Sequence, residues 1–357
     1  MGSKAYLVLE NGKVFSGKPF GAVEDVMAEV VFTTGMTGYL ETLTDKSFFG
    51  QIVVQTFPLV GNYGVIPSDF EGEMIGPSGY IVKQWCQEPS NFRSEGSLDT
   101  FFRERGIVGL SDVDTRALTR IIRENGVMNG VITSDPDKVD FEKLKAYKVT
   151  NAVESTSTKE IQTYPNDNKC CSVAVVDYGM LKSLRTKLER FGAEVTVCPH
   201  NVTAQQLEEL GVDAIVLSDG PGDPTDCKDE IEAIKEIVKL NKPIFAVGMG
   251  HELLALANGF KTEKLTYGHR GANQPVKNID NGRVYVTSQN HGYAVVASSI
   301  DTGVAEEYFV NVNDNTCEGI RYKSIPAVSV QFTPDAGNGS ADTTFLLKDF
   351  INKVATN

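Results

Sequence analysis

Hydrophobic and polar positions divide the chain into two parts with different periodicities. The first 150 residues hold short β-like runs separated by turn residues, for example at 5–15, 28–34 and 50–58. From residue 171 onward, short apolar runs alternate with amphipathic segments at helical spacing. Such alternation predicts a parallel, doubly wound sheet. We therefore expect an α/β protein, with a β-rich α/β domain at 1–150 and a doubly wound, mostly parallel sheet at 170–357.

Turn and capping residues mark the ends of single elements. In the second part, the pattern predicts strands at 171–179, 194–199, 213–218 and 243–247, and helices at 180–192, 203–211 and 229–240. Thr203 and Gln206 have the spacing of a capping box. In the first part, a helical pattern covers 112–126 and closes on Asn125-Gly126. The polar stretch 151–169 has almost no apolar periodicity, which predicts an interdomain linker.

Composition and charge exclude several classes of function. The 357 residues carry a formal net charge of -13, which argues against nucleic acid as a partner because phosphates require a basic surface. No apolar run approaches the roughly 18 residues that span a membrane, and the first residues lack a signal-peptide pattern. We expect a cytoplasmic protein. The six cysteines form no CxxC pair, so reduced thiols and no metal site are expected.

One stretch, 242–260 (KPIFAVGMGHELLALANGF), predicts a strand, a tight turn at residues 248–250 and a helix that stops at Asn258-Gly259. These are the parts of a nucleophile elbow, which presents one reactive side chain at its apex. The apex here is Gly248, which has no side chain. Elbow residues have strained dihedrals that cost about 1–3 kcal/mol, and glycine adopts a positive φ without that cost. We expect a relaxed turn at Gly248.

Several motifs carry a resemblance to a known family. The stretches SDGPGDP (218–224), FAVGMGHELLAL (245–256), TSQNHGYAV (287–295) and VQFTPDA (330–336) together resemble a class I glutamine amidotransferase domain. Two stretches of the first part, 33–64 and 112–132, resemble the N-terminal domain of the small subunit of carbamoyl phosphate synthetase. The resemblance covers nearly the whole chain, and the motifs occur in the family's order.

The resemblance implies a function and a partner. In that family the small subunit hydrolyses glutamine and passes ammonia to a large subunit, which uses bicarbonate, ATP and magnesium to make carbamoyl phosphate for arginine and pyrimidine synthesis. A heterodimer with a large subunit is therefore expected, and no cofactor is expected in this chain. The family's small subunit uses a Cys nucleophile at the elbow, a His base and a Glu that orients the His.

All three catalytic positions of the family's motifs are changed in this sequence. The elbow pattern G-x-C-x-G-H-Q places Gly248 at the nucleophile position. The pattern H-P-E places Thr333 at the base position and Asp335 at the orienting position. Glycine cannot attack a carbonyl, and a threonine hydroxyl does not accept a proton near neutral pH. We therefore predict that no catalytic residue of the glutaminase is active.

The implied glutamine-binding shell is partly retained. It maps onto the backbone or side chains of Ser47, Gly220, Gly222, Met249, Glu252, Asn290, Gly292 and Tyr293. Two amides of the family's motifs are replaced by carboxylates, at Asp219 and Glu252. If both face the pocket, these carboxylates repel the α-carboxylate of glutamine and favour ammonium instead. Glutamine and ammonium both stay open as ligands.

Three functions remain open at this point. The first is a small subunit whose glutaminase is lost, so that the complex uses ammonia and this chain has a structural or regulatory role. The second is a glutamine-hydrolysing subunit with an unorthodox nucleophile, for which Cys227 is the nearest thiol by motif. The third is a stand-alone ligand-binding module. His251 is expected to be a packed structural histidine, and His291 to line the pocket with a role in organising the backbone.

Overall fold

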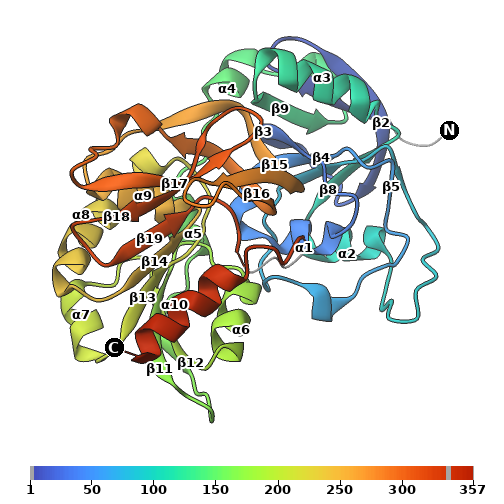
Figure 1. Ribbon diagram of the computed structural model, residues 1–357. Coiled ribbons are helices and arrows are strands. Elements are labelled where there is room, and N and C mark those ends of the chain that lie inside the picture. Colours follow the sequence, from blue (N-terminus) through green and yellow to red (C-terminus); the bar gives the residue numbers. More distant parts are fainter. Residues whose placement is uncertain (1–3, 335–338, 357) are drawn as a thin grey trace. The chain divides into compact units, whose positions relative to one another are not determined.

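The computed structural model describes residues 4–334 and 339–356, and the chain divides into two compact units, Met1–Thr150 and Asn151–Asn357. Each unit has its own sheet (Figure 1). Among the described residues, no helix has both the length and the apolar character needed to cross a membrane.

The first unit is built around a closed barrel with the strand order β1-β2-β8-β6-β4-β3-β9. These strands are β1 (Ala5–Leu9), β2 (Val14–Gly21), β3 (Val26–Thr33), β4 (Gln51–Gln55), β6 (Gly79–Ile81), β8 (Val108–Ser111) and β9 (Met128–Thr133). The unit also contains β5 (Leu59–Val60), β7 (Gln84–Trp85), α1 (Tyr39–Thr44), α2 (Leu98–Arg105), α3 (Thr115–Asn125) and α4 (Phe141–Ala146). The helix expected at 112–126 therefore begins three residues later, because Asp114 caps its N-terminus and Asp112 has a left-handed φ of 62°.

The second unit is a ten-stranded sheet with the order β10-β12-β11-β13-β14-β19-β18-β17-β15-β16. Its strands are β10 (Gln162–Tyr164), β11 (Cys171–Asp177), β12 (Ala193–Pro199), β13 (Ala214–Leu217), β14 (Ile244–Val247), β15 (Thr262–Asn278), β16 (Val284–Val295), β17 (Ala305–Asn311), β18 (Cys317–Tyr322) and β19 (Ala327–Val330). The five strands from β12 to β19 in this order pair in parallel, whereas β10 and the extension β18-β17-β15-β16 are antiparallel. The expected doubly wound parallel sheet is thus the centre of a larger mixed sheet.

Helices cover both faces of the parallel strands. They are α6 (Lys182–Arg190), α7 (Ala204–Glu209), α8 (Lys228–Ile237), α9 (Met249–Ala257) and α10 (Phe345–Thr356). Buried residues of α7, α8 and α9 share a core with one face, and α6 and α10 pack side by side on the other (Figure 1). Along β11, Ala174 and Val176 face the first core and Val173 and Val175 face the second, because side chains alternate along a strand.

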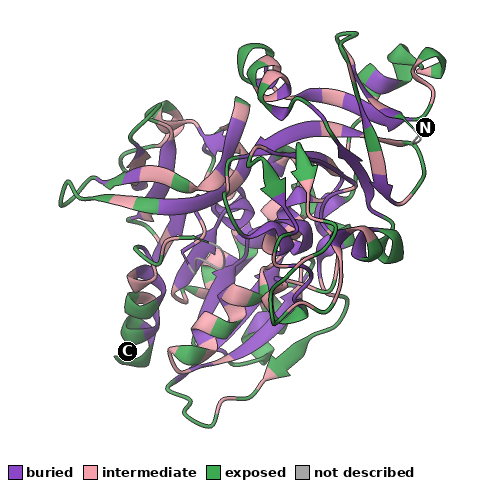
Figure 2. Ribbon diagram, turned by 90° about the vertical axis from the view of Figure 1, so that its right-hand side faces the viewer, coloured by how far each residue is buried: buried purple, intermediate pink, exposed green. Residues whose placement is uncertain are grey.

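Burial follows the layers. Figure 2 shows the central strands buried along most of their length and the helices with an exposed outer stripe. The capping box predicted at Thr203 is present, with both reciprocal hydrogen bonds to Gln206. Local patterns thus place α7 where the sequence predicts it.

The stretch 151–169, expected to be a linker, instead carries two elements of the second unit. These are α5 (Ala152–Thr156) and β10, which pairs with β12. Val153 is 4% exposed and joins the core beneath α8 and α9, and the Thr156 hydroxyl donates to the Tyr178 carbonyl at 3.1 Å. The linker prediction is therefore wrong for this stretch. Its apolar residues are too few to show a period in the sequence, but tertiary contacts bury them.

Candidate functional site

Three neighbouring parallel strands bring two of the altered catalytic positions, Gly248 and Thr333, to the same edge of the sheet as Asp219. Strand register places Leu217 of β13 beside Ala246 of β14, and Val247 of β14 beside Val330 of β19. The segments that leave these strands therefore lie at one edge of the sheet, where ligands of doubly wound sheets bind. These segments carry Asp219, Gly248 and Thr333, so the order of the strands assembles residues that lie far apart in the sequence.

The turn at Gly248 keeps the elbow geometry. Its backbone has φ 52° and ψ -114°, a conformation that L side chains rarely adopt, and its N–H donates to the Val330 carbonyl at 2.9 Å. Glycine occupies this conformation without the steric cost of a Cβ atom. The turn is thus retained although it carries no reactive side chain, as the sequence predicts.

The carboxylate of Asp219 fills the space in front of Gly248. A Cβ atom added to Gly248 would lie 2.1 Å from Asp219 Oδ1 and 2.5 Å from its Cγ. The same Oδ1 accepts hydrogen bonds from the backbone N–H groups of Gly220 at 2.7 Å and Met249 at 3.1 Å. Two backbone donors that converge on one oxygen form the arrangement that stabilises an oxyanion in acyl transfer.

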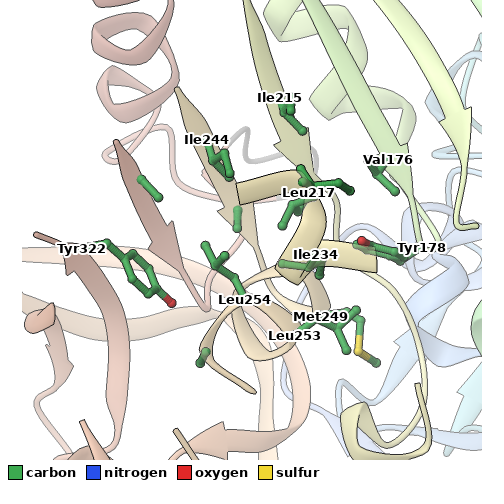
Figure 3. Packing of buried hydrophobic residues seen from close by; sticks show 14 of the residues in the cluster. Val176, Tyr178, Ile215, Leu217, Ile234, Ile244, Met249, Leu253, Leu254 and Tyr322 are labelled. Atoms are coloured by element: carbon green, nitrogen blue, oxygen red, sulfur yellow. The ribbon is translucent and has the colours of Figure 1, made fainter. Parts of the chain in front are cut away.

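Three of the expected binding positions, Met249, Gly220 and Gly222, are defined by their backbone rather than by a side chain. Met249 is 2% exposed, and Figure 3 shows its side chain among the buried hydrophobic residues of the core that contains Leu253 and Ile234. Its N–H, by contrast, is directed to the elbow turn. Gly220 packs so tightly that a Cβ would lie 2.4 Å from the Tyr178 carbonyl oxygen, and Gly222 has a φ of 102°. Both loop glycines are therefore required by the backbone.

Thr333 stands at the base position without a group that can act as a base. Its N–H donates to the Ser288 carbonyl at 3.0 Å, which joins it to β16 as an isolated bridge. The side chain is half-buried. Asp335, expected at the orienting position, lies outside the described residues.

Glu252 does not add charge to the elbow turn in the way the sequence suggests. It is 3% exposed, and its Oε1 accepts from Gln331 Nε2 at 3.0 Å. Burial raises the pKa of Glu252 well above its usual range, and Asp219 and Asp223 raise it further. A raised pKa favours the neutral form of the Glu252 carboxyl group. Gln331 was not identified from the sequence, because no local pattern joins it to α9.

The remaining expected binding residues come from two different places. Asn290, Gly292 and Tyr293 are half-buried on β16, where Asn290 pairs with Arg270 of β15. Arg270 is 6% exposed and was missed by the sequence analysis, although a buried arginine one strand away is a candidate for carboxylate binding. Ser47 belongs to the first unit, where its N–H donates to Asp45 Oδ1 at 2.8 Å and its buried hydroxyl has no hydrogen-bond partner among the described residues.

A cluster on the antiparallel extension has the residue types of a metal site. His269, His291 and Glu318 each place one ligand atom within 4.8 Å of the others. His269 Nε2 lies 2.8 Å from Asp314 Oδ2, and its Nδ1 lies 3.3 Å from Glu318 Oε1. Burial lowers the pKa of His269, but Glu318 and Asp314 outweigh it and raise the pKa. The raised pKa favours the charged form of His269, which lies within ion-pair distance of Asp314 and Glu318, so an ion-pair network accounts for this cluster.

The other histidines and thiols near the elbow turn offer no replacement nucleophile or base among the described residues. His251 is fully buried and bonded to the Ser329 hydroxyl at 2.7 Å, and burial lowers its pKa to about 3, in keeping with the expected packed role. His291 Nδ1 lies 2.7 Å from the Tyr293 carbonyl, in keeping with a backbone-organising role. Burial raises the pKa of the Cys227 thiol to about 12, and Glu230 and Asp226 add to the shift. Cys227 therefore lacks the thiolate character that a nucleophile needs.

Comparisons with known proteins agree in both units. Residues 7–132 match the family model described as "Carbamoyl-phosphate synthase small chain, CPSase domain", and residues 174–353 match "Glutamine amidotransferase class-I". The chain is 45% identical over 353 residues to the carbamoyl phosphate synthase small chain of Bacillus thuringiensis subsp. konkukian, covering 98% of this chain and 96% of that one. It is 46% identical over 355 residues to the small chain of Fusobacterium nucleatum subsp. nucleatum, covering 98% of each. A crystal structure of a glutamine amidotransferase from Thermotoga maritima aligns with 52% of this chain and 84% of that chain, with 16% identity and a TM-score of 0.39.

Proposed function

The chain belongs to the carbamoyl phosphate synthase small chain family, and from this premise we propose that it is a small chain whose own glutaminase site is silent. In this proposal it binds a large chain, and the complex takes its nitrogen from ammonia. The small chain then serves the assembly structurally or in regulation.

One observation carries the proposal: the elbow turn has kept its backbone and lost its nucleophile. Gly248 has the positive φ of an elbow apex. The space in front of it, where a nucleophile's side chain would lie, is filled by the Asp219 carboxyl group, which accepts from the Met249 N–H. A family of enzymes that attack an amide needs a nucleophile at the apex and a base beside it. Thr333 at the base position cannot take up the proton near neutral pH.

The alternative of a functional glutaminase requires a nucleophile from elsewhere. Cys227 is the thiol next to the GPGDP loop, and its pKa of about 12 keeps it protonated. His251, the histidine that follows the turn, is buried and bonded to Ser329. These features favour the silent site over an unorthodox nucleophile.

The experiment compares nitrogen donors. The chain is combined with a carbamoyl phosphate synthase large chain, and carbamoyl phosphate formation is measured with glutamine and with ammonium chloride. We expect formation with ammonium and none above background with glutamine. The ammonium arm shows that the complex is assembled and active, so it is the internal control for the glutamine arm. Formation with glutamine at a comparable rate would overturn the proposal.

A further inference from the structure

We propose that Asp219 is a built-in occupant of the oxyanion site, whose carboxylate holds the two backbone donors at the elbow turn and keeps an amide substrate out. This inference rests on the proposed function, since it describes how the silent site is closed. It goes further because it assigns a role to a residue outside the three altered catalytic positions. It also links the acid at position 219 to the glycine at position 248.

The two donors are available to Asp219 because no helix or strand uses them. Met249 opens α9, and the first N–H groups of a helix have no partner within the helix. Other N–H groups of this turn are occupied, since Gly250 donates to the Ser218 carbonyl at 2.9 Å and Glu252 to the Gly248 carbonyl at 3.1 Å. The Met249 N–H is instead directed to the space that Asp219 Oδ1 fills.

The second donor is fixed by close packing. Gly220 lies against the backbone of Tyr178, the residue that follows β11, and this close approach leaves no room for a Cβ atom. The Gly220 N–H reaches Asp219 Oδ1 at 2.7 Å. One carboxyl oxygen therefore accepts from both donors, in the position that the oxyanion of a tetrahedral intermediate would take. An oxygen acceptor in this position satisfies backbone groups that would otherwise be unpaired near the core.

The same carboxylate excludes a side chain at the apex. A Cβ atom at position 248 would overlap Oδ1 and approach Oδ2 to 3.0 Å. A nucleophile at 248 and the observed carboxylate position are thus mutually exclusive. In this proposal a cysteine restored at 248 competes with the Asp219 carboxyl group for the same space, so its thiol is hindered while Asp219 remains.

The test uses the full-length chain with G248C and with G248C/D219A. Each is treated with iodoacetamide, and alkylation of the peptide that contains position 248 is followed by mass spectrometry. We expect alkylation at least about tenfold faster in G248C/D219A than in G248C. A matched control is G248C/D223A, because Asp223 Oδ1 accepts from Thr225 and not from the two donors at the turn. It should be alkylated at the rate of G248C.

Equal alkylation rates in G248C and G248C/D219A would overturn the proposal. If G248C fails to fold, the chain with D219A alone gives a second measurement, because it keeps Gly248. Isothermal titration with glutamine should then show binding to D219A and none to the unchanged chain. Equal binding by both, or by neither, would also overturn it. None of these results depends on the nitrogen-donor assay: glutamine-dependent synthesis by the unchanged complex would overturn the proposed function by itself.

Discussion

Two polar regions of the second unit, the elbow turn and the network around His269, differ in which polar side chains they contain and in what those side chains contact. At the elbow turn, the positions for nucleophile and base carry Gly248 and Thr333, and the Asp219 carboxylate accepts from two backbone N–H groups. In the network on the antiparallel extension, His269 lies between the carboxylates of Asp314 and Glu318. The first region has no nucleophile or base side chain at these two positions, while the second holds charged side chains that contact one another.

The difference shows which groups the fold itself depends on. Glu318 is fully buried and accepts from Gln289 Nε2 at 2.9 Å and from Asn311 Nδ2 at 3.0 Å. Removing it leaves donors on three strands without this acceptor, so the sheet extension depends on it. A cysteine at 248 would not supply such a hydrogen bond to the sheet, and glycine adopts the positive φ of this turn without a steric cost. The backbone at this edge of the sheet therefore forms without a reactive side chain at position 248.

The largest predicted effect comes from breaking the network. E318A leaves His269, Gln289 and Asn311 facing a buried void, and we expect it to lower the free energy of unfolding by about 3–5 kcal/mol. Denaturant unfolding of the full chain measures the change. E306A is the matched control, because Glu306 forms partly exposed ion pairs with Arg321 and Lys323. It should cost at most about 1 kcal/mol. A loss in E318A no greater than in E306A would show that the network is not held by Glu318.

The next largest effect is expected from adding a Cβ atom at the elbow turn. G248A should destabilise the second unit by about 2–4 kcal/mol, because alanine meets both an unfavourable φ and the Asp219 carboxylate. G259A is the control for the backbone alone, since Gly259 has a φ of 85° and nothing lies within 4 Å of an added Cβ. It should cost about 1–2 kcal/mol. Equal losses in thermal or denaturant unfolding would mean that Asp219 yields to a side chain at 248 without cost.

A smaller effect, counted per pH unit, is expected in the pH dependence of the unfolding free energy. It distinguishes His251, which follows the elbow turn, from His269 in the network. The folded pKa of His251, about 3, lies below the unfolded value, so the unfolded chain binds more protons as pH falls below about 6.5. Stability contributed by neutral His251 is present above about pH 6.5 and declines below it by about 1.4 kcal/mol per pH unit. H251Q should remove that part of the slope between about pH 6 and 4. His291, whose pKa is also lowered, keeps a slope of the same sign in this variant.

His269 has the opposite sign. Its folded pKa is raised, so its contribution is fully present below the unfolded pKa and is lost as pH rises through the folded value. H269Q should therefore flatten the stability curve on the alkaline side of about pH 6.5 and leave the acid slope assigned to His251. Unfolding curves recorded at a series of pH values measure both. If H251Q and H269Q changed the dependence of stability on pH on the same side of about pH 6.5, the opposite signs assigned to His251 and His269 would be wrong.

Much of the second unit follows from local sequence. The strands of the parallel centre and the helices between them lie within a few residues of the predicted positions, because each has its own apolar period and its own cap or stop. The stretch 151–169 does not follow, since its buried residues, such as Val153, are too few to form a period. The antiparallel extension was also not foreseen, because pairing such as His269 with His291 depends on strands whose register no local signal fixes.

The sequence by itself determined the family resemblance and which residues stand at the three motif positions, because Gly248, Thr333 and Asp335 are read directly from it. It also indicated that Asp219 and Glu252 replace amides. Only the tertiary structure decided where these two carboxylates go: Glu252 to Gln331 in the core, and Asp219 to the two backbone donors at the turn. The physical reason is the separation along the chain between the residues that interact. Periodicity and capping act within one segment, whereas a buried carboxylate is placed by donors that come from strands and helices far apart in the chain.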